Sequence, residues 1–290
     1  MNKIVLGTVQ FGLDYGINNF SGKPSENLVK EILDEAYKEG VKFLDTAEAY
    51  GDAHEVIGNY HKKSGNKFRI ITKFSSTKTD LPANFSKRVE QHLVDLNVET
   101  LYCYMFHSFD DFKIHYKENA SEIFQLKEAG VIEKFGVSVY NNTEIETLLD
   151  FPEVDLIQLP FNLLDNAKQR SEILLKAKER GVEIHTRSVY LQGLFFKDLN
   201  TLSSKLLPLK QELDKVNSIS NSTGIKISDL SFTYVFQQDY IDKILIGVDT
   251  VEQLRINLEA TNTIIPKSIM DKIDSINVED KSLLNPSNWN

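Results

Sequence analysis

The sequence of 290 residues has almost no cysteine and no long apolar run. Its single cysteine, Cys103, cannot form an internal disulfide and belongs to no metal-ligand spacing, so we expect no metal site. No apolar run approaches the roughly 18 residues of a membrane-spanning helix, so we expect no membrane partner. The first residues, Met1 to Ile4, lack the apolar core and small-residue cleavage site of a signal peptide. These absences predict a soluble, cytoplasmic protein.

The chain also has fewer positive than negative charges: it contains 33 Lys and Arg residues and 42 Asp and Glu residues, so its formal net charge is −9. Binding to duplex nucleic acid relies on a basic surface, so we expect no nucleic-acid partner. The outer faces of the predicted helices carry no large apolar patch, which favours a monomer. The apolar content of 41% is that of an ordinary globular protein.

What the chain does contain is one repeated unit, a short apolar strand followed by a charged amphipathic helix. The predicted strands are Lys3–Gly7, Lys42–Asp45, Arg69–Lys73, Leu101–Phe106, Val131–Val137, Val154–Leu159, Val182–Arg187 and Lys243–Gly247. The predicted helices are Glu26–Glu39, Asp52–His61, Ala83–Leu96, Glu118–Ala129, Thr143–Leu149, Asn166–Arg180, Ser228–Gln238 and Val251–Ala260.

Alternating strands and helices predict a parallel sheet with right-handed crossovers. Eight such units fit a closed (β/α)8 TIM barrel better than an open doubly wound sheet. No G-x-G-x-x-G motif follows the first strand, because Gly7, Gly12 and Gly16 are too widely spaced. We therefore expect one α/β barrel domain over residues 1–290. A long insert over about residues 189–226, after the seventh strand, is typical of a lid or binding loop.

Four polar residues lie at or just beyond the carboxyl ends of three consecutive predicted strands. Asp45 ends the second strand, and Tyr50 follows it in the segment "DTAEAYG". Lys73 ends the third strand and His107 follows the fourth. Because the carboxyl ends of barrel strands share one face, we expect these side chains to converge there.

These residue types fit a proton-delivery device. A phenol has a pKa of roughly 10, and a neighbouring ammonium favours its phenolate form. An aspartate keeps the ammonium charged and oriented, and a histidine can hydrogen-bond the oxygen of a bound carbonyl. Together they could protonate an oxygen while a hydride arrives on carbon, but the hydride itself must come from a cofactor.

With these residues the chain resembles the aldo-keto reductase superfamily over essentially its full length. The motifs that carry the resemblance are "LGTVQFG", "FLDTAEAYG", "ITKF", "MFHS", "FGVSVYN", "IQLPFN" and "IGVDTVEQLRINL". The resemblance implies a (β/α)8 barrel that reduces an aldehyde or ketone to an alcohol with NAD(P)H. It also implies that Tyr50 is the general acid/base, that Lys73 and Asp45 tune it, and that His107 orients the carbonyl.

The resemblance also implies cofactor contacts. Ser138 and Gln158 match residues that hold the nicotinamide carboxamide, and Thr8 matches one near the nicotinamide ribose. Val139 stands where family members usually have Asn. Arg187 stands where they have a stacking aromatic residue, and it either stacks on the nicotinamide or reaches an anionic group of the substrate. Two further matches, Ser188 and Gly193, occupy positions that approach the pyrophosphate.

The adenosine end is expected near "IGVDTVEQLRIN". Expected contacts here are Gly247, Asp249, Gln253 and Asn257. The carboxylate of Asp249 would repel a 2′-phosphate, and Arg255 offers a cation only if it points inward. The family favours NADP(H), whereas this local chemistry leaves NAD(H) open.

The substrate pocket is expected to be a mixture of apolar and polar side chains, suited to a sugar-like or moderately polar carbonyl or a small aromatic aldehyde. The expected walls are Phe11, Phe74, Phe109, Phe161, Asn162 and Tyr190. A short loop over Ser108–Lys117 is expected beside it. Trp289 either closes over the pocket or belongs to a disordered tail.

Two other functions are compatible with the sequence. The first is a nucleotide-sensing interaction subunit on the same fold, and the second is a lyase that forms a Schiff base on Lys73. The remaining histidines lack ligand spacing and are interpreted as surface or packing residues: His54, His61, His92, His115 and His185.

Overall fold

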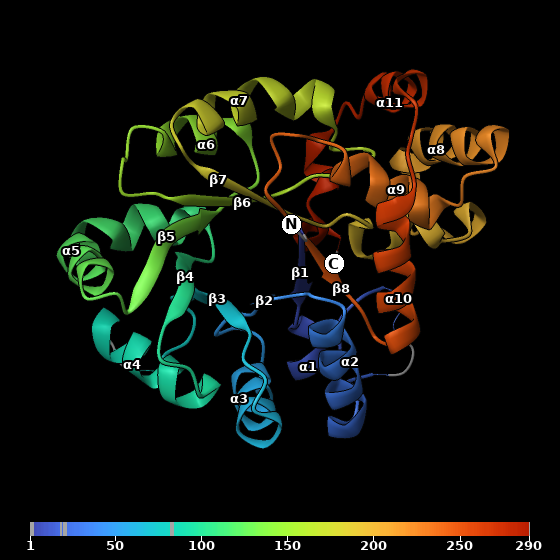
Figure 1. The fold of residues 1–290 in the computed structure, drawn as a ribbon. Helices are drawn as coiled ribbons and strands as arrows, with labels where there is room; N and C mark the ends of the chain where they lie inside the picture. The colour runs from blue at the N-terminus through green and yellow to red at the C-terminus, as the bar shows by residue number, and fades with distance from the viewer. Residues whose placement is uncertain (1–2, 18, 20–21, 82–83, 290) are drawn as a thin grey trace.

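The computed structural model describes residues 3–17, 19, 22–81 and 84–289. Within them, eight strands pair in parallel, each with the next in chain order, and the eighth pairs with the first. The sheet is therefore a closed barrel, and helices surround it (Figure 1). This confirms the predicted α/β fold, a (β/α)8 TIM barrel.

The observed strands lie within two residues of the predicted ones at either end. They are β1 (Ile4–Gly7), β2 (Phe43–Asp45), β3 (Arg69–Phe74), β4 (Leu101–Phe106), β5 (Ile132–Ser138), β6 (Leu156–Pro160), β7 (Glu183–Arg187) and β8 (Lys243–Gly247). The helices are α1 (Val9–Gly12), α2 (Glu26–Lys38), α3 (Ala53–Ser64), α4 (Phe85–Leu96), α5 (Phe109–Glu128), α6 (Asn142–Leu148), α7 (Ala167–Glu179), α8 (Lys210–Thr223), α9 (Ile227–Phe236), α10 (Val251–Glu259) and α11 (Lys267–Asp274). Ala83, the predicted start of one helix, lies outside the described residues.

The prediction was wrong at the start of α5. The sequence predicted a loop over Ser108–Lys117 and a helix from Glu118, whereas α5 begins at Phe109. The Ser108 hydroxyl caps the helix by accepting a hydrogen bond of 3.0 Å from the backbone N–H of Asp111. The connection from β4 is therefore too short to form a substrate loop.

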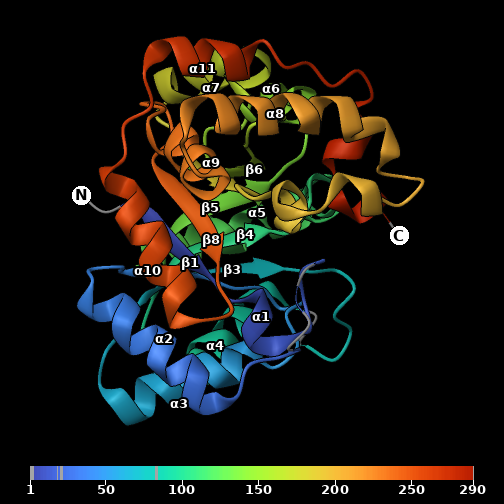
Figure 2. The ribbon, with the colours of Figure 1, turned by 90° about the vertical axis from the view of Figure 1, so that its right-hand side faces the viewer.

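The segment between β7 and α9 lies where the insert was predicted. It contains three 3₁₀ turns, η1 (Leu191–Phe196), η2 (Leu199–Thr201) and η3 (Leu207–Leu209), followed by α8. Figure 2 shows the first and last described segments of the chain at opposite ends of the barrel, with the gold-coloured turns η1 and η2 toward the end where the last described segment lies. The insert thus contributes to the face formed by the carboxyl ends of the strands.

An apolar layer fills the middle of the barrel. Val5, Ile71, Met105 and Leu156 come from four different strands and pack together with Cys103. Cys103 is fully buried, and burial raises the pKa of its thiol, as expected for a small core residue. In the described part of the chain, no helix is both long enough and apolar enough to cross a membrane.

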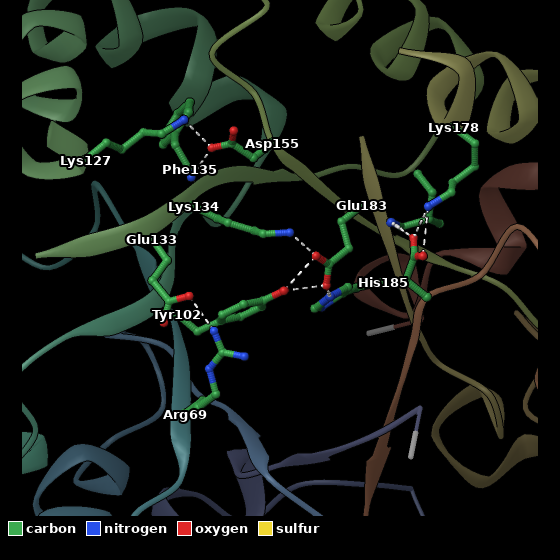
Figure 3. Close-up of polar contacts among 12 residues, drawn as sticks. Arg69, Tyr102, Lys127, Glu133, Lys134, Phe135, Asp155, Lys178, Glu183 and His185 are labelled. Atoms are coloured by element: carbon green, nitrogen blue, oxygen red, sulfur yellow. Dashed lines mark hydrogen bonds and ion pairs between the residues drawn. The ribbon is translucent and has the colours of Figure 1, made fainter. Parts of the chain in front are cut away.

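A charged cluster lies at the end of the barrel where the strands begin. Glu183 of β7 accepts hydrogen bonds of 2.6 and 2.8 Å from the Tyr102 hydroxyl and forms an ion pair with Lys134 (Figure 3). The His185 Nε2 lies 2.6 Å from the same carboxylate, and His185 is fully buried. His185 is thus a packing residue with a polar partner.

This cluster makes the free energy of unfolding depend on pH in the acidic range. Burial alone would raise the pKa of Glu183, but its contacts with His185, Lys134 and Tyr102 outweigh burial and hold the pKa well below its usual range. The ionised carboxylate therefore stabilises the fold above its unfolded-state pKa of about 4.3, and this contribution is lost as the pH falls toward the folded-state value. We expect the difference in unfolding free energy between wild type and Glu183→Gln to shrink between about pH 5 and pH 3.

Urea unfolding at each pH measures this difference. Glu99→Gln, at an exposed position, is the matched control and should show no such pH dependence. A difference for Glu183→Gln that stays constant over the same pH range contradicts the prediction.

Candidate active site

A cavity of about 640 Å³ opens at the carboxyl ends of the strands. Its walls come from the ends of β1, β2, β5, β6, β7 and β8 and from the loops that follow them. Three of the predicted catalytic residues, Asp45, Tyr50 and His107, line it directly. The fourth, Lys73, lies behind Asp45 and forms an ion pair with it. The structure therefore brings the four predicted residues together.

The ion pair is fully enclosed. Lys73 and Asp45 are each about 1% exposed. The Lys73 ammonium also donates to the carbonyl oxygen of Thr46 at 3.0 Å, and the Gln158 amide donates to Asp45 Oδ2 at 2.8 Å. The neighbouring strands β2 and β3, the loop after β2, and Gln158 of the more distant strand β6 thus hold one aspartate and one ammonium in fixed positions.

The phenol and the imidazole lie beside each other above this pair. The ring centroids of Tyr50 and His107 are 5.7 Å apart, and the rings meet edge to face. Burial, helped by the charges of Lys73 and Arg187, lowers the pKa of His107 to about 3. The imidazole is therefore neutral near pH 7 and has one N–H group with which it can orient a carbonyl oxygen.

The expected depression of the Tyr50 pKa does not occur in this structure. Burial raises the pKa above its ordinary value, and the charge of Asp45 raises it further, against a smaller lowering effect of Arg187. Lys73 lies over the ring face of Tyr50, with its ammonium 5.2 Å from the ring centroid, and Asp45 compensates its charge. The hydroxyl of Tyr50 therefore keeps its proton near neutral pH.

A buried glutamate anchors the loop that carries Tyr50. Glu48 accepts hydrogen bonds from the backbone N–H of Ser75 at 2.9 Å, from Arg88 at 2.9 Å and from the Tyr104 hydroxyl at 2.6 Å. Its other close contact is the His92 Nε2, at 2.7 Å. These contacts tie the loop to β3, β4 and α4. The motif "DTAEAYG" thus owes its shape to its central Glu as well as to Asp45 and Tyr50.

The loop also packs closely against α1. A Cβ atom at Gly12 would lie 1.8 Å from the carbonyl oxygen of Tyr50, which no side chain can tolerate. Gly12 therefore fixes the position of the Tyr50 backbone through close approach of the two segments.

Every residue predicted to contact the cofactor lines the cavity. These residues are Thr8, Ser138, Gln158, Arg187, Ser188, Gly193, Gly247, Asp249, Gln253 and Asn257. The hydroxyl of Thr8 donates to the carbonyl of Asp45 at 2.9 Å, which joins this wall of the cavity to the Lys73–Asp45 pair. A Cβ atom at Gly247 would lie 2.5 Å from the Gln10 amide, so the glycine leaves room for the Gln10 side chain in this wall.

Two buried oxygens of this wall, Gln10 Oε1 and Asp249 Oδ1, have no hydrogen-bond partner among the described residues. Burial raises the pKa of Asp249, while its contact with Gln253 lowers it by less. Both oxygens are acceptors, so they suit a ligand that presents hydroxyl or amide donors. Arg255 points away from the cavity and forms an ion pair of 2.7 Å with Glu35 of α2.

The loop after β7 is conformationally strained. Ser188, Leu191 and Gln192 have φ values of 60°, 47° and 53°, in the left-handed region that non-glycine residues seldom adopt. Gly193 follows with φ of 90°. Strain of this kind persists where the surrounding structure requires one particular loop shape, and it gathers at binding sites.

The predicted substrate walls are mostly misplaced. Phe11, Phe74 and Phe161 are buried in the core, Phe109 starts α5 and packs on Phe112, and none of them lines the cavity. Asn162 is also buried, where its amide oxygen accepts hydrogen bonds from the N–H groups of the turn after β6.

Tyr190 is the predicted wall residue that does line the cavity, and its hydroxyl bonds to the side chain of Asn257. Trp289 neither closes the pocket nor forms a free tail, since its indole N–H donates to the carbonyl of Leu283 at 2.8 Å and its ring packs on the core.

Sequence reasoning missed several cavity residues. They are chiefly Gln10, Tyr15, Asn19, Tyr140, Gln192, Phe196, Ser228 and Ile256. Tyr140 follows Ser138 by two residues, and Tyr15 and Asn19 follow β1, so all three come from loops after strand ends. Their position in these loops could have identified them from the sequence, because the loops after the strands form the active face of a barrel.

Comparison with known proteins gives consistent matches. The family model described as the aldo/keto reductase family matches residues 3–278. The chain is 24% identical over 90% of its length to the uncharacterized oxidoreductase YqkF of Bacillus subtilis, covering 92% of that protein. It is also 24% identical over 90% of its length to the NADH-specific methylglyoxal reductase of Escherichia coli, covering 94% of it.

Among solved structures, an aldo-keto reductase of Bacillus halodurans in its holo form superimposes with a TM-score of 0.76 at 20% identity, covering 96% of this chain and 94% of that one. The glycerol dehydrogenase of Gluconobacter oxydans gives 0.73 at 22% identity, with coverage of 94% and 90%. These structural likenesses show the shared fold.

Proposed function

The chain belongs to the aldo/keto reductase family, and on this premise we propose that it reduces an aldehyde or ketone with a nicotinamide nucleotide, with Tyr50 as the proton donor. The observation that carries the proposal is the convergence of Tyr50, His107 and the enclosed Lys73–Asp45 pair at one end of a cavity. Such a constellation suits a reaction in which a carbonyl oxygen must be oriented and protonated.

Each residue has a distinct part in this reaction. The neutral imidazole of His107 donates to the carbonyl oxygen and places it beside Tyr50. The Tyr50 hydroxyl then gives its proton to that oxygen as negative charge develops there. The Lys73 ammonium stabilises the phenolate left behind, and Asp45 holds the ammonium in place.

The nucleotide would occupy the same cavity, with its nicotinamide beside Tyr50. When bound, the reduced nicotinamide supplies the hydride that these side chains cannot supply. Ser138 and Gln158 offer the hydroxyl and amide groups that would hold its carboxamide, and the bond from Gln158 to Asp45 fixes the Gln158 side chain. The unpartnered oxygens of Gln10 and Asp249 would accept hydrogen bonds from the same ligand.

Two alternatives receive less support. Lys73 does not line the cavity, and Asp45 and Thr46 occupy its ammonium, so a Schiff base on it is disfavoured. A nucleotide-sensing role without turnover leaves the complete catalytic set unexplained.

We propose that the protein is a cytoplasmic monomer that acts on a small-molecule carbonyl. The composition and the dispersed exposed apolar side chains favour a monomer in the cytoplasm.

The direct test is carbonyl-dependent oxidation of NADH and of NADPH by the purified protein. Methylglyoxal is a suitable first substrate because one relative is named as its reductase, and sugar-like and aromatic aldehydes follow. We expect turnover with at least one carbonyl. Binding of nucleotide without turnover of any carbonyl would favour the sensing role instead.

The cofactor wall favours NAD(H) over the NADP(H) expected from the family. The Asp249 carboxylate is unpartnered at Oδ1 and would accept a hydrogen bond from a ribose hydroxyl, whereas it would repel a 2′-phosphate. Arg255, the expected cation, is engaged by Glu35 outside the cavity. We therefore propose NADH as the preferred reductant.

Replacement of Asp249 tests this preference. We expect Asp249→Asn to lower the ratio of the NADPH to the NADH dissociation constant by at least about 10-fold, because it removes a repulsive charge and a charged acceptor. Fluorescence titration with each nucleotide measures the ratio. Asp239→Asn, on an exposed turn, makes the same change in charge and should leave it unaltered. An unchanged ratio in Asp249→Asn, or wild-type preference for NADPH, contradicts the assignment.

A further inference from the structure

We propose that Arg187 forms an anion-binding subsite beside Tyr50, so that the preferred carbonyl substrates carry a carboxylate. This inference rests on the proposed function and narrows its substrate class. It depends on the position of the guanidinium, on the balance of charge along the cavity and on the hydroxyl groups around it.

Arg187 ends β7 and is half-buried at the cavity wall. Its guanidinium carbon lies 4.3 Å from the centroid of the Tyr140 ring. One nitrogen, Nη2, donates to the carbonyl oxygen of Val139 at 3.3 Å. The ring and the carbonyl restrain the guanidinium plane, and its other N–H groups have no acceptor among the described residues. A planar carboxylate is the partner that such a fork matches.

Arg187 brings a positive charge to the cavity wall. No carboxylate among the described residues forms an ion pair with it. Two acidic side chains line the cavity, and Asp45 is already paired with Lys73. The other, Asp249, lies beside Gln253 at the start of α10. A half-buried cation is costly without a partner, so an anionic ligand group gains affinity here.

Hydroxyl groups complete the subsite. Tyr15 and Tyr140 line the same cavity, and the Tyr15 hydroxyl accepts a hydrogen bond of 2.8 Å from the Gln192 amide, which leaves its own hydrogen to donate. Burial is the main cause of the raised pKa of Tyr50 and of the lowered pKa of His107, and the charge of Arg187 acts on both groups in the lowering direction. This effect agrees with the position of Arg187 near the reacting groups. A guanidinium and phenol donors thus face the space beside Tyr50.

The competing role for Arg187 is to contact the nucleotide alone. That role predicts equal effects on charged and neutral substrates, whereas an anion subsite predicts a selective one. The matched substrates 4-formylbenzoate and 4-formylbenzamide differ in charge and have nearly the same shape, so they separate the two roles.

The first experiment measures kcat and KM for both substrates with wild type and Arg187→Met. We expect wild type to prefer the carboxylate by at least about 10-fold in kcat/KM, and the variant to lose that preference mainly through KM. The amide should lose less than the carboxylate, so that the ratio of the two kcat/KM values falls by at least about 10-fold. Arg180→Met removes one exposed positive charge at the far end of β7 and should behave as wild type. Equal losses for both substrates, together with weaker nucleotide binding, overturn the proposal in favour of a cofactor contact.

The second experiment does not depend on turnover. Calorimetric titration of 4-(hydroxymethyl)benzoate and of 4-(hydroxymethyl)benzamide into the protein with excess NADH compares the two products directly. We expect the carboxylate to bind at least about 10-fold more tightly to wild type and no more tightly than the amide to Arg187→Met. If wild type does not distinguish the two ligands, the subsite proposal fails even where the amide aldehyde is reduced. If it does distinguish them without any turnover, the subsite stands and the reductase assignment fails.

Discussion

Replacing Tyr50 by Phe is expected to lower kcat for carbonyl reduction by about 10³-fold while leaving nucleotide affinity within about twofold. The substitution removes one oxygen and keeps the ring that packs edge to face on His107. Among the residues that the structure describes, no other phenol is both this close to His107 and backed by the Lys73 ammonium. Any other proton donor then lacks both the contact with His107 and the neighbouring ammonium.

Single-turnover kinetics and nucleotide titration separate the two effects. Tyr37→Phe, on the outer helix α2, removes the same atom away from the cavity and should leave kcat unchanged. Substantial activity in Tyr50→Phe would transfer the role of proton donor to another group.

The wild-type rate of reduction should stay flat between about pH 6 and pH 9, since Tyr50 keeps its proton and His107 stays neutral over that range.

The end of the cavity that holds Tyr50 and His107 was predictable because its residues have fixed positions relative to strands. Asp45 and Lys73 are strand residues, and His107 follows a strand directly. All strands of a parallel barrel run in the same direction, so their carboxyl ends lie on the same face. A residue at the carboxyl end of a strand is therefore placed on that face by its position in the sequence. Tyr50 was predictable through the spacing of its motif, whose shape the buried Glu48 maintains.

The substrate walls were less predictable because they depend on the direction of individual side chains. Phe74 follows Lys73 in β3, and successive residues of a strand face opposite sides. Since Lys73 points inward, Phe74 must point outward, where it packs against Phe85. Alternation along the strand could have excluded it.

Loop conformation limited the prediction elsewhere. Nothing in the residue types of the loop after β7 indicates that Ser188, Leu191 and Gln192 adopt positive φ values. That conformation depends on tertiary contacts, and it determines that Gln192 meets Tyr15 across the cavity. The direction of Arg187 toward Tyr140 also follows from packing rather than from sequence spacing.

Replacing Lys73 by Met is expected to lower the free energy of unfolding by about 3–5 kcal/mol and to lower kcat by at least about 10²-fold. Met nearly preserves the length of the side chain, so the main change is loss of the ammonium. Asp45 would then remain about 1% exposed with Gln158 as its principal side-chain donor. An ionised carboxylate left in that position is an uncompensated buried charge, which is more costly than the intact pair.

The double variant Asp45→Asn, Lys73→Met distinguishes the electrostatic cause from a packing defect. Removing both charges should recover part of the lost stability, because an amide can stay buried beside Gln158 at lower cost than a carboxylate. Activity should not recover, since the phenolate of Tyr50 would still lack its ammonium. Chemical unfolding and kcat measured on the same variants test both statements. A double variant less stable than Lys73→Met would mean that Lys73 and Asp45 stabilise the fold mainly through packing rather than through their charges. Recovery of kcat in the double variant would exclude Lys73 from the mechanism.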